Sequence, residues 1–79
     1  MIASLRGRLV YKDAQGAVIE CGGVGYGLAM SLSSLARIGS EGSEVHVLVH
    51  THVSQDALRL YGFLDAEERR SFEVLVSIT

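Results

Sequence analysis

The sequence predicts a mainly β protein: a small closed barrel of five to six short strands, with one short helix in a connection between strands. Apolar and polar residues alternate with a period of two along several short stretches, which is typical of half-buried strands. Glycines and small polar residues separate these stretches at turn positions, and the chain contains no proline. A length of 79 residues suits one small domain.

Composition narrows the function classes. The hydrophobic content of 48% argues against disorder, and the net charge of −2 gives no general attraction for nucleic acid. Cys21 is the only cysteine, so no disulfide can form within the chain. The sequence shows no signal peptide and no apolar run long enough to span a membrane, so we expect a cytoplasmic protein.

Residues 2–12 form the first expected strand, with Leu5, Gly7, Leu9 and Tyr11 on one face. Gly7 in mid-strand predicts a bulge or a sharp bend there. The opposite face carries three cations, which are either a solvated surface or candidate phosphate contacts: Arg6, Arg8 and Lys12.

After a turn over residues 13–16, two further strands are expected around a tight turn at Gly22 and Gly23. A phosphate-binding loop is excluded, because the pattern G-x-G-x-x-G would need a glycine at Leu28 or Met30. The strand after the turn directs its bulky side chains to the core: Val24, Tyr26, Leu28 and Met30.

Residues 31–39 predict a short helix that begins at a serine cap and ends at Gly39. The candidate caps are Ser31, Ser33 and Ser34, and the inward-facing residues are Leu32, Leu35 and Ile38.

Residues 44–53 form the clearest strand, with a β-branched core face made of Val45, Val47, Val49, Thr51 and Val53. His46, His50 and His52 lie on the opposite face. His50 and His52 would be about 7 Å apart, but zinc needs four ligands and the sequence offers no others at suitable spacing. We therefore expect a half-exposed polar face and no metal.

Residues 54–56 are an expected polar tip, and residues 57–63 the returning strand. Asp65 is the expected N-cap of a final helix. Its predicted buried stripe is Phe72, Leu75, Val76 and Thr79, and its predicted exposed residues are Glu67, Arg70 and Ser71. This order of elements is that of the OB fold, with the final helix outside the barrel. Because the apolar stripe still runs where the sequence stops, we expect an N-terminal piece of a longer protein.

The sequence offers no catalytic residues and no cofactor site. It contains no G-x-S-x-G motif, and its histidines lie along a strand rather than beside a nucleophile. We therefore expect no catalysis by this chain.

Several segments together resemble one family. Residues 1–7, residues 18–26 with their run GGVGY, the run LYGF at 60–63 and the helix over 67–79 are all similar to the RuvA family. RuvA proteins bind Holliday junctions, the four-way DNA intermediates of recombination and repair, as the non-catalytic subunit of the bacterial branch-migration complex. The resemblance implies that residues 1–64 are an N-terminal OB-fold domain. Residues 65–79 would be the first helix of a truncated helix-hairpin-helix domain.

The resemblance also implies partners. These are four-way junction DNA, further copies of the chain in a homotetramer that can pair with a second tetramer, and, through the complete protein, the RuvB ATPase motor and the RuvC resolvase. No cofactor and no membrane are implied.

A candidate site follows from the same resemblance. The family carries an acidic pin, usually two acids on the tip before the last barrel strand, which repels phosphates where the DNA strands cross. The pin falls on Gln55 and Asp56. Because one of these two residues is an amide, the role is assigned to Asp56, and Gln55 is the weaker candidate.

Two alternatives stay open. One is a generic OB domain that stacks single-stranded bases on aromatic residues in a basic groove. The five aromatic residues are Tyr11, Tyr26, Tyr61, Phe63 and Phe72, most of which we expect in the core. The other is a structural assembly module without a ligand, favoured by the glycine-rich strand and the apolar final helix.

Overall fold

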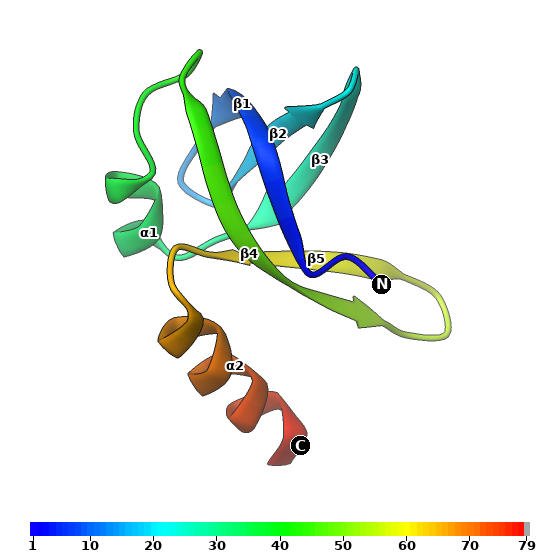
Figure 1. Ribbon diagram of the computed structural model, residues 1–79. Coiled ribbons are helices and arrows are strands. Elements are labelled where there is room, and N and C mark those ends of the chain that lie inside the picture. Colours follow the sequence, from blue (N-terminus) through cyan, green and yellow to red (C-terminus); the bar gives the residue numbers. More distant parts are fainter. Residues whose placement is uncertain (79) are drawn as a thin grey trace.

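The structure is a computed structural model that describes residues 1–78. Five strands form a closed barrel in the order β1-β2-β3-β5-β4 (Figure 1). The strands are β1 (Ser4–Lys12), β2 (Gly16–Cys21), β3 (Val24–Ala29), β4 (Glu44–Val53) and β5 (Leu58–Phe63). Helix α1 (Leu32–Arg37) connects β3 to β4, and helix α2 (Ala66–Ile78) follows β5. This order confirms the predicted OB fold.

Neighbouring strands pair antiparallel except at one seam, where β3 and β5 run parallel and pair only at Ala29 and Tyr61. Gly22 and Gly23 make the turn between β2 and β3 with φ values of 57° and 86°. Such angles favour glycine, so the sequence predicts this turn correctly.

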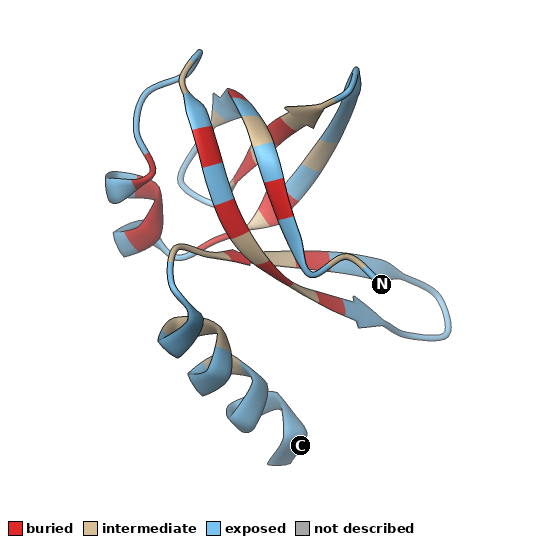
Figure 2. Ribbon diagram, viewed as in Figure 1, coloured by how far each residue is buried: buried red, intermediate tan, exposed pale blue. Residues whose placement is uncertain are grey.

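The core lies inside the barrel and under α1. Buried positions alternate with exposed ones along the strands, and α1 adds a buried face (Figure 2). The buried apolar residues are Leu5, Leu9, Ala17, Ile19, Leu28, Met30, Leu35, Ile38, Val45, Val47, Val49 and Leu60.

Strand β1 differs from the prediction in one respect. Its bulge does not lie at Gly7, because the register with β2 shifts between Leu9 and Tyr11. This shift changes the alternation, so Tyr11 is exposed and not in the core. Gly7 has another role: a Cβ at this position would collide with the carbonyl oxygen of Glu20, so the two strands approach closely there.

Predicted core residues are buried where the barrel closes and exposed at its ends. Leu28, Met30, Leu35 and Ile38 are buried as predicted, whereas the predictions for Val24, Leu32 and Val53 are wrong. Val24 lies at the start of β3, Leu32 at the start of α1 and Val53 at the end of β4, and all three side chains are exposed.

Helix α1 begins where the sequence predicts. Ser31 is its N-cap, and the Ser31 hydroxyl accepts a hydrogen bond of 3.1 Å from the backbone N–H of Ser34. This interaction satisfies one of the free donors of the first turn.

Helix α2 begins where predicted but is not buried. The carboxylate of Asp65 accepts a hydrogen bond from the backbone N–H of Glu68 at 2.9 Å, which confirms the N-cap. Glu67, Arg70 and Ser71 are exposed as predicted. The predicted buried stripe is wrong: Phe72 is half-buried, Leu75 is 65% exposed and Val76 is also exposed. Thr79 lies outside the described residues.

The reason for this exposure is that α2 meets the barrel edge-on, mainly at β4 and β5, and extends away from it (Figures 1 and 2). Among residues 1–78, no helix is long and apolar enough to cross a membrane.

Candidate functional site

The outer end of the β4–β5 hairpin projects from the barrel as a narrow pair of strands (Figure 1). The first half of β4 pairs with β1, from Glu44 with Arg8 to Leu48 with Ser4. Beyond Leu48, the backbone N–H of Val49 still donates to the carbonyl oxygen of Ala3 at 2.8 Å. The ladder with β5 then continues to the pairs His52–Arg59 and Val53–Leu58. We call residues 52–59 the ribbon. Val53 and Leu58 are 68% and 63% exposed, because no core lies beneath this end of the hairpin.

The tip of the ribbon is an exposed turn over residues 54–57. It is closed by a hydrogen bond of 2.8 Å from the backbone N–H of Ser54 to the carbonyl oxygen of Ala57. The side chains of Gln55 and Asp56 make no hydrogen bond or ion pair within residues 1–78. The carboxylate of Asp56 is therefore available to act on whatever approaches the tip.

The three cations of β1 do not form one stripe. Arg8 pairs with Glu20 at 3.1 Å. Lys12, turned by the bulge, donates from Nζ to the carbonyl oxygens of Leu35 at 3.0 Å and Gly39 at 2.8 Å, at the end of α1. The exposed guanidinium of Arg6 has no partner within residues 1–78 and alone remains available for a phosphate.

A groove of about 520 Å³ runs along β2, β3 and the start of β5, beside the open part of the seam. This is the surface on which OB folds commonly bind oligonucleotides. It presents Tyr11 and Tyr26 but only one cation, Arg59, and one acid, Asp13. The groove is therefore not the basic surface that single-strand binding by stacking would favour.

Asp13 serves the turn between β1 and β2. Its carboxylate accepts hydrogen bonds from the backbone N–H groups of Gln15 at 2.8 Å and Gly16 at 3.1 Å, which lower the pKa of this carboxyl. The same negative charge raises the pKa of the neighbouring Tyr11 hydroxyl. This acid thus has a structural role.

An aromatic cluster outside the barrel joins β4 and β5 to α2. The Phe72 ring centroid lies 4.8 Å from that of Tyr61, 5.2 Å from Phe63 and 5.4 Å from His50. His50 Nδ1 also lies 2.9 Å from Glu73 Oε2. Tyr61 and Phe63, which belong to the aromatic residues mostly expected in the core, instead form the surface on which Phe72 of α2 packs.

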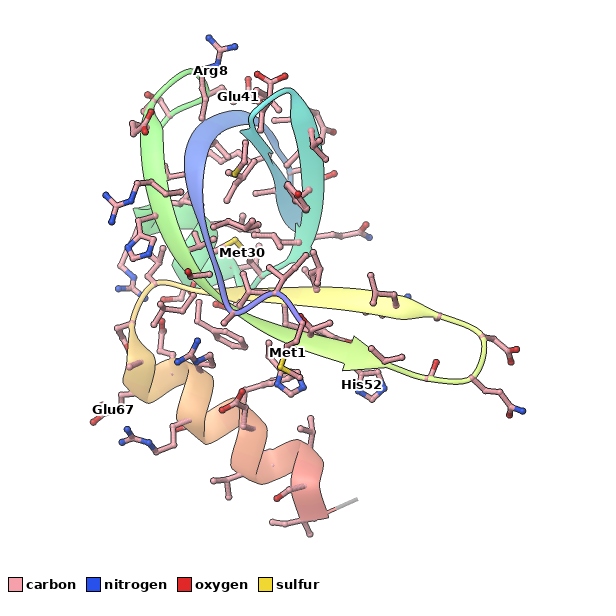
Figure 3. All side chains as sticks on the ribbon, turned by 45° about the vertical axis from the view of Figure 1, so that its right-hand side comes forward. Met1, Arg8, Met30, Glu41, His52 and Glu67 are labelled. Atoms are coloured by element: carbon pink, nitrogen blue, oxygen red, sulfur yellow. The ribbon has the colours of Figure 1, made fainter. Side chains whose placement is uncertain are left out.

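Two polar contacts hold the start of α2 to the rest of the fold. Arg37 pairs with Glu68 at 3.0 Å, and Arg69 donates to the carbonyl oxygen of Ala3 at 3.0 Å. Together with the aromatic cluster, these contacts place α2 at the base of the ribbon (Figure 3).

The histidines of β4 do not assemble into a metal centre. Within residues 1–78 no group of three or more His, Cys, Asp or Glu side chains could hold a metal ion. His50 is in the aromatic cluster, while His46 and His52 are exposed. The predicted half-exposed polar face of β4 describes what is seen.

The sequence did not single out Arg59, whose side chain the structure leaves exposed on the ribbon. It faces His52 across the ribbon, three positions after Asp56. The alternation of β5 places Arg59 on the outward face with Tyr61 and Phe63, and this signal could have found it.

The fold and the projecting tip define an OB-fold domain that presents a narrow, acid-tipped ribbon next to an external helix. A family model described as the RuvA N terminal domain matches residues 1–62 of the chain. The chain therefore belongs to the RuvA family.

Curated relatives agree with this assignment. The chain is 48% identical over 79 residues to a protein of Acidobacterium capsulatum, 46% to one of Rubrobacter xylanophilus and 44% to one of Acetivibrio thermocellus. Each of these is named Holliday junction branch migration complex subunit RuvA. The alignments cover all of this chain and 39–40% of each relative, so the chain spans about two fifths of the length of the proteins it matches.

Proposed function

We propose that this chain is the part of a Holliday-junction-binding subunit that lies at the centre of the four-way junction and keeps the crossover open during branch migration. The observation that carries the proposal is the exposed Asp56, without a partner within residues 1–78, at the tip of a ribbon that projects from the barrel. The names of the relatives support the same role.

The physical basis is charge repulsion. Phosphates from all four arms converge at the crossover of a junction, and a carboxylate held among them raises the energy of closing the strands together. Screening limits this effect to about 8–10 Å at physiological salt, so the acid must be brought close to the crossing strands. A narrow ribbon two strands wide does this. Gln55 beside Asp56 adds no charge, so the pin of this protein rests on one acid per copy.

The proposal includes assembly and partners. Copies of the chain form a homotetramer around the junction, able to pair with a second tetramer. The complete protein meets the RuvB ATPase motor and the RuvC resolvase in the cytoplasm, while the chain itself is non-catalytic and needs no cofactor. Residues 1–64 form the central OB-fold domain, and residues 65–79 open a helix-hairpin-helix domain that carries most of the DNA affinity. Of the cations of β1, Arg6 is the remaining candidate for a phosphate contact.

The test is the variant Asp56→Asn of the complete protein. Its affinity for a four-way junction and its rate of branch migration with the motor present are measured. We expect the affinity for a four-way junction to change by less than about fivefold, because an exposed charge contributes no more than about 1 kcal/mol. The rate of branch migration should change more, since the repulsion acts on the moving crossover.

Asp13→Asn is the matched control, since it removes the same charge from the turn between β1 and β2, where the Asp13 carboxylate accepts hydrogen bonds from the backbone of its own turn. Branch migration that is unchanged in Asp56→Asn, or changed equally in Asp13→Asn, would show that Asp56 is not the pin.

A further inference from the structure

The structure separates the cations that stabilise the fold from those that do not. The sequence contains seven lysine and arginine residues. Four are engaged within residues 1–78, either with a carboxylate or with backbone carbonyls: Arg8, Lys12, Arg37 and Arg69. Three guanidinium groups have no partner among the described residues: Arg6, Arg59 and Arg70.

Arg59 differs from the other two because it lies on the ribbon. It is paired in register with His52, and both side chains are exposed on the outward face (His52 is labelled in Figure 3). Directly opposed residues of an antiparallel pair have Cβ atoms about 5 Å apart. The two groups can therefore reach one common ligand.

This pair gives the fold no stabilisation of its own. His52 makes no hydrogen bond or ion pair within residues 1–78, and its imidazole stands directly opposite the Arg59 side chain. An imidazole N–H and a guanidinium are both hydrogen-bond donors. An anion bound between them would accept from both, and a phosphate offers the acceptors that a guanidinium binds best.

We propose that His52 and Arg59 form a phosphate-binding site on the outward face of the ribbon, which holds the backbone of a DNA strand beside the crossover. This inference rests on the proposed function and adds an attractive contact to the repulsive tip. Arg59 follows Asp56 by three residues, so even a fully extended chain would keep their Cα atoms within about 10 Å of each other. The repulsive and the attractive group therefore lie close together on the same ribbon.

The ribbon then has a polarity. Its tip repels phosphates from the centre of the junction, and its base binds a phosphate of a strand leaving the centre. Because the interaction is with the DNA backbone, it favours no base sequence, as a subunit that follows a moving crossover requires.

The test is the salt dependence of binding by the native chain carrying Arg59→Gln, measured with a four-way junction and with a linear duplex of equal length. The slope of the logarithm of the association constant against the logarithm of salt concentration should become shallower by about 0.9 for each phosphate that the variant no longer neutralises. We expect this change on the junction and an unchanged slope on the duplex. His52→Gln should also weaken junction binding, by a smaller factor than Arg59→Gln.

Two control variants make the result specific. Arg8→Gln removes the same charge at the far end of the barrel from His52, where Arg8 pairs with Glu20, and it should leave the slope unchanged (Figure 3). Arg59→Lys keeps the charge and should keep the slope.

Three results would overturn the proposal: a wild-type slope in Arg59→Gln, equal changes of slope on junction and duplex, or a change in Arg59→Lys as large as in Arg59→Gln. A wild-type protein that binds the junction no tighter than the duplex would instead refute the proposed function itself, whatever the variants do.

Discussion

The two ends of the β4–β5 hairpin are built from the same kinds of residue and behave differently. Inside the barrel, Val47 and Val49 are almost completely buried, and Leu60 of β5, paired with Thr51, is buried as well. On the ribbon, Val53 and Leu58 continue the same face but are largely exposed. One end of the hairpin holds the barrel together, and the other extends a strand pair into solvent.

The same contrast appears in the two hairpin turns that carry an aspartate. Asp13, between β1 and β2, accepts hydrogen bonds from two backbone N–H groups of its own turn. Asp56, between β4 and β5, makes none within residues 1–78. An acid that does not stabilise its turn is free to serve a ligand, so the comparison separates residues that maintain the fold from residues available for function.

The test of this comparison with the largest expected change in stability is a pair of valine-to-alanine substitutions on β4. We expect Val47→Ala to lower the free energy of unfolding by about 2 kcal/mol, since each buried methyl group contributes about 0.8 kcal/mol and the cavity adds to the loss. Val53→Ala should stay within about 0.5 kcal/mol of wild type, as is usual for exposed positions. Urea unfolding of the two variants measures both effects.

Equal losses of stability in the two variants would contradict the comparison. They would mean that another surface covers the ribbon face of Val53 in solution, as it could in an assembly of copies.

The alternation of residues predicted most of the barrel, and the exceptions have physical causes. A period of two specifies which side chains share a face, but it does not specify where the barrel ends. Val53 therefore had the signature of a core residue although no core lies under it. The bulge between Leu9 and Tyr11 depends on pairing with β2, which the sequence of β1 alone does not encode. The exposure of Tyr11 and the direction of the Lys12 side chain follow from this bulge.

The candidate site was predictable to a similar degree. The polar residues 54–56 between two strand patterns predicted the tip, which the structure extends to residue 57, and the resemblance to the RuvA family implies the role proposed for Asp56. The sequence did not separate the cations, because Arg6, Arg8 and Lys12 look alike until their partners are known. Lys12 lies beside Leu35 and Gly39, which are 23 and 27 residues away in sequence, and no local pattern indicates such contacts.

The second test concerns the base of the ribbon, where α2 packs. Phe72→Ala removes the ring that contacts Tyr61, Phe63 and His50. We expect a destabilisation of at least about 1 kcal/mol, because aromatic pairs contribute about 0.5–1.5 kcal/mol in addition to the area that the half-buried ring covers. Hydrogen exchange should show faster exchange in α2 and unchanged protection in the barrel strands.

Leu75→Ala is the control on the same helix, and its exposed side chain predicts little change. If barrel amides lost protection as much as those of α2 in Phe72→Ala, the barrel and the helix would be one cooperative unit, and the aromatic cluster would count as part of the core.

The test with the smallest expected effect compares the two aspartates by the pH dependence of the Tm. Backbone hydrogen bonds hold the pKa of Asp13 below its value in the unfolded chain. The ionised carboxylate therefore stabilises the fold above about pH 4, and this contribution is lost as the pH falls through the folded-state pKa. We expect Asp13→Asn to have a lower Tm than wild type at pH 7, with the difference shrinking as the pH falls below about 4 and through the lowered pKa of folded Asp13, where the wild-type carboxyl also becomes neutral. Asp56→Asn should leave the Tm at pH 7 unchanged, because the Asp56 carboxylate binds no donor within residues 1–78.

A Tm difference for Asp13→Asn that persists unchanged at about pH 3, well below the ordinary pKa of an aspartate, would mean that the charge of Asp13 does not stabilise the turn. A drop for Asp56→Asn at pH 7 would mean that the tip acid supports the fold, and the distinction between the two turns would disappear.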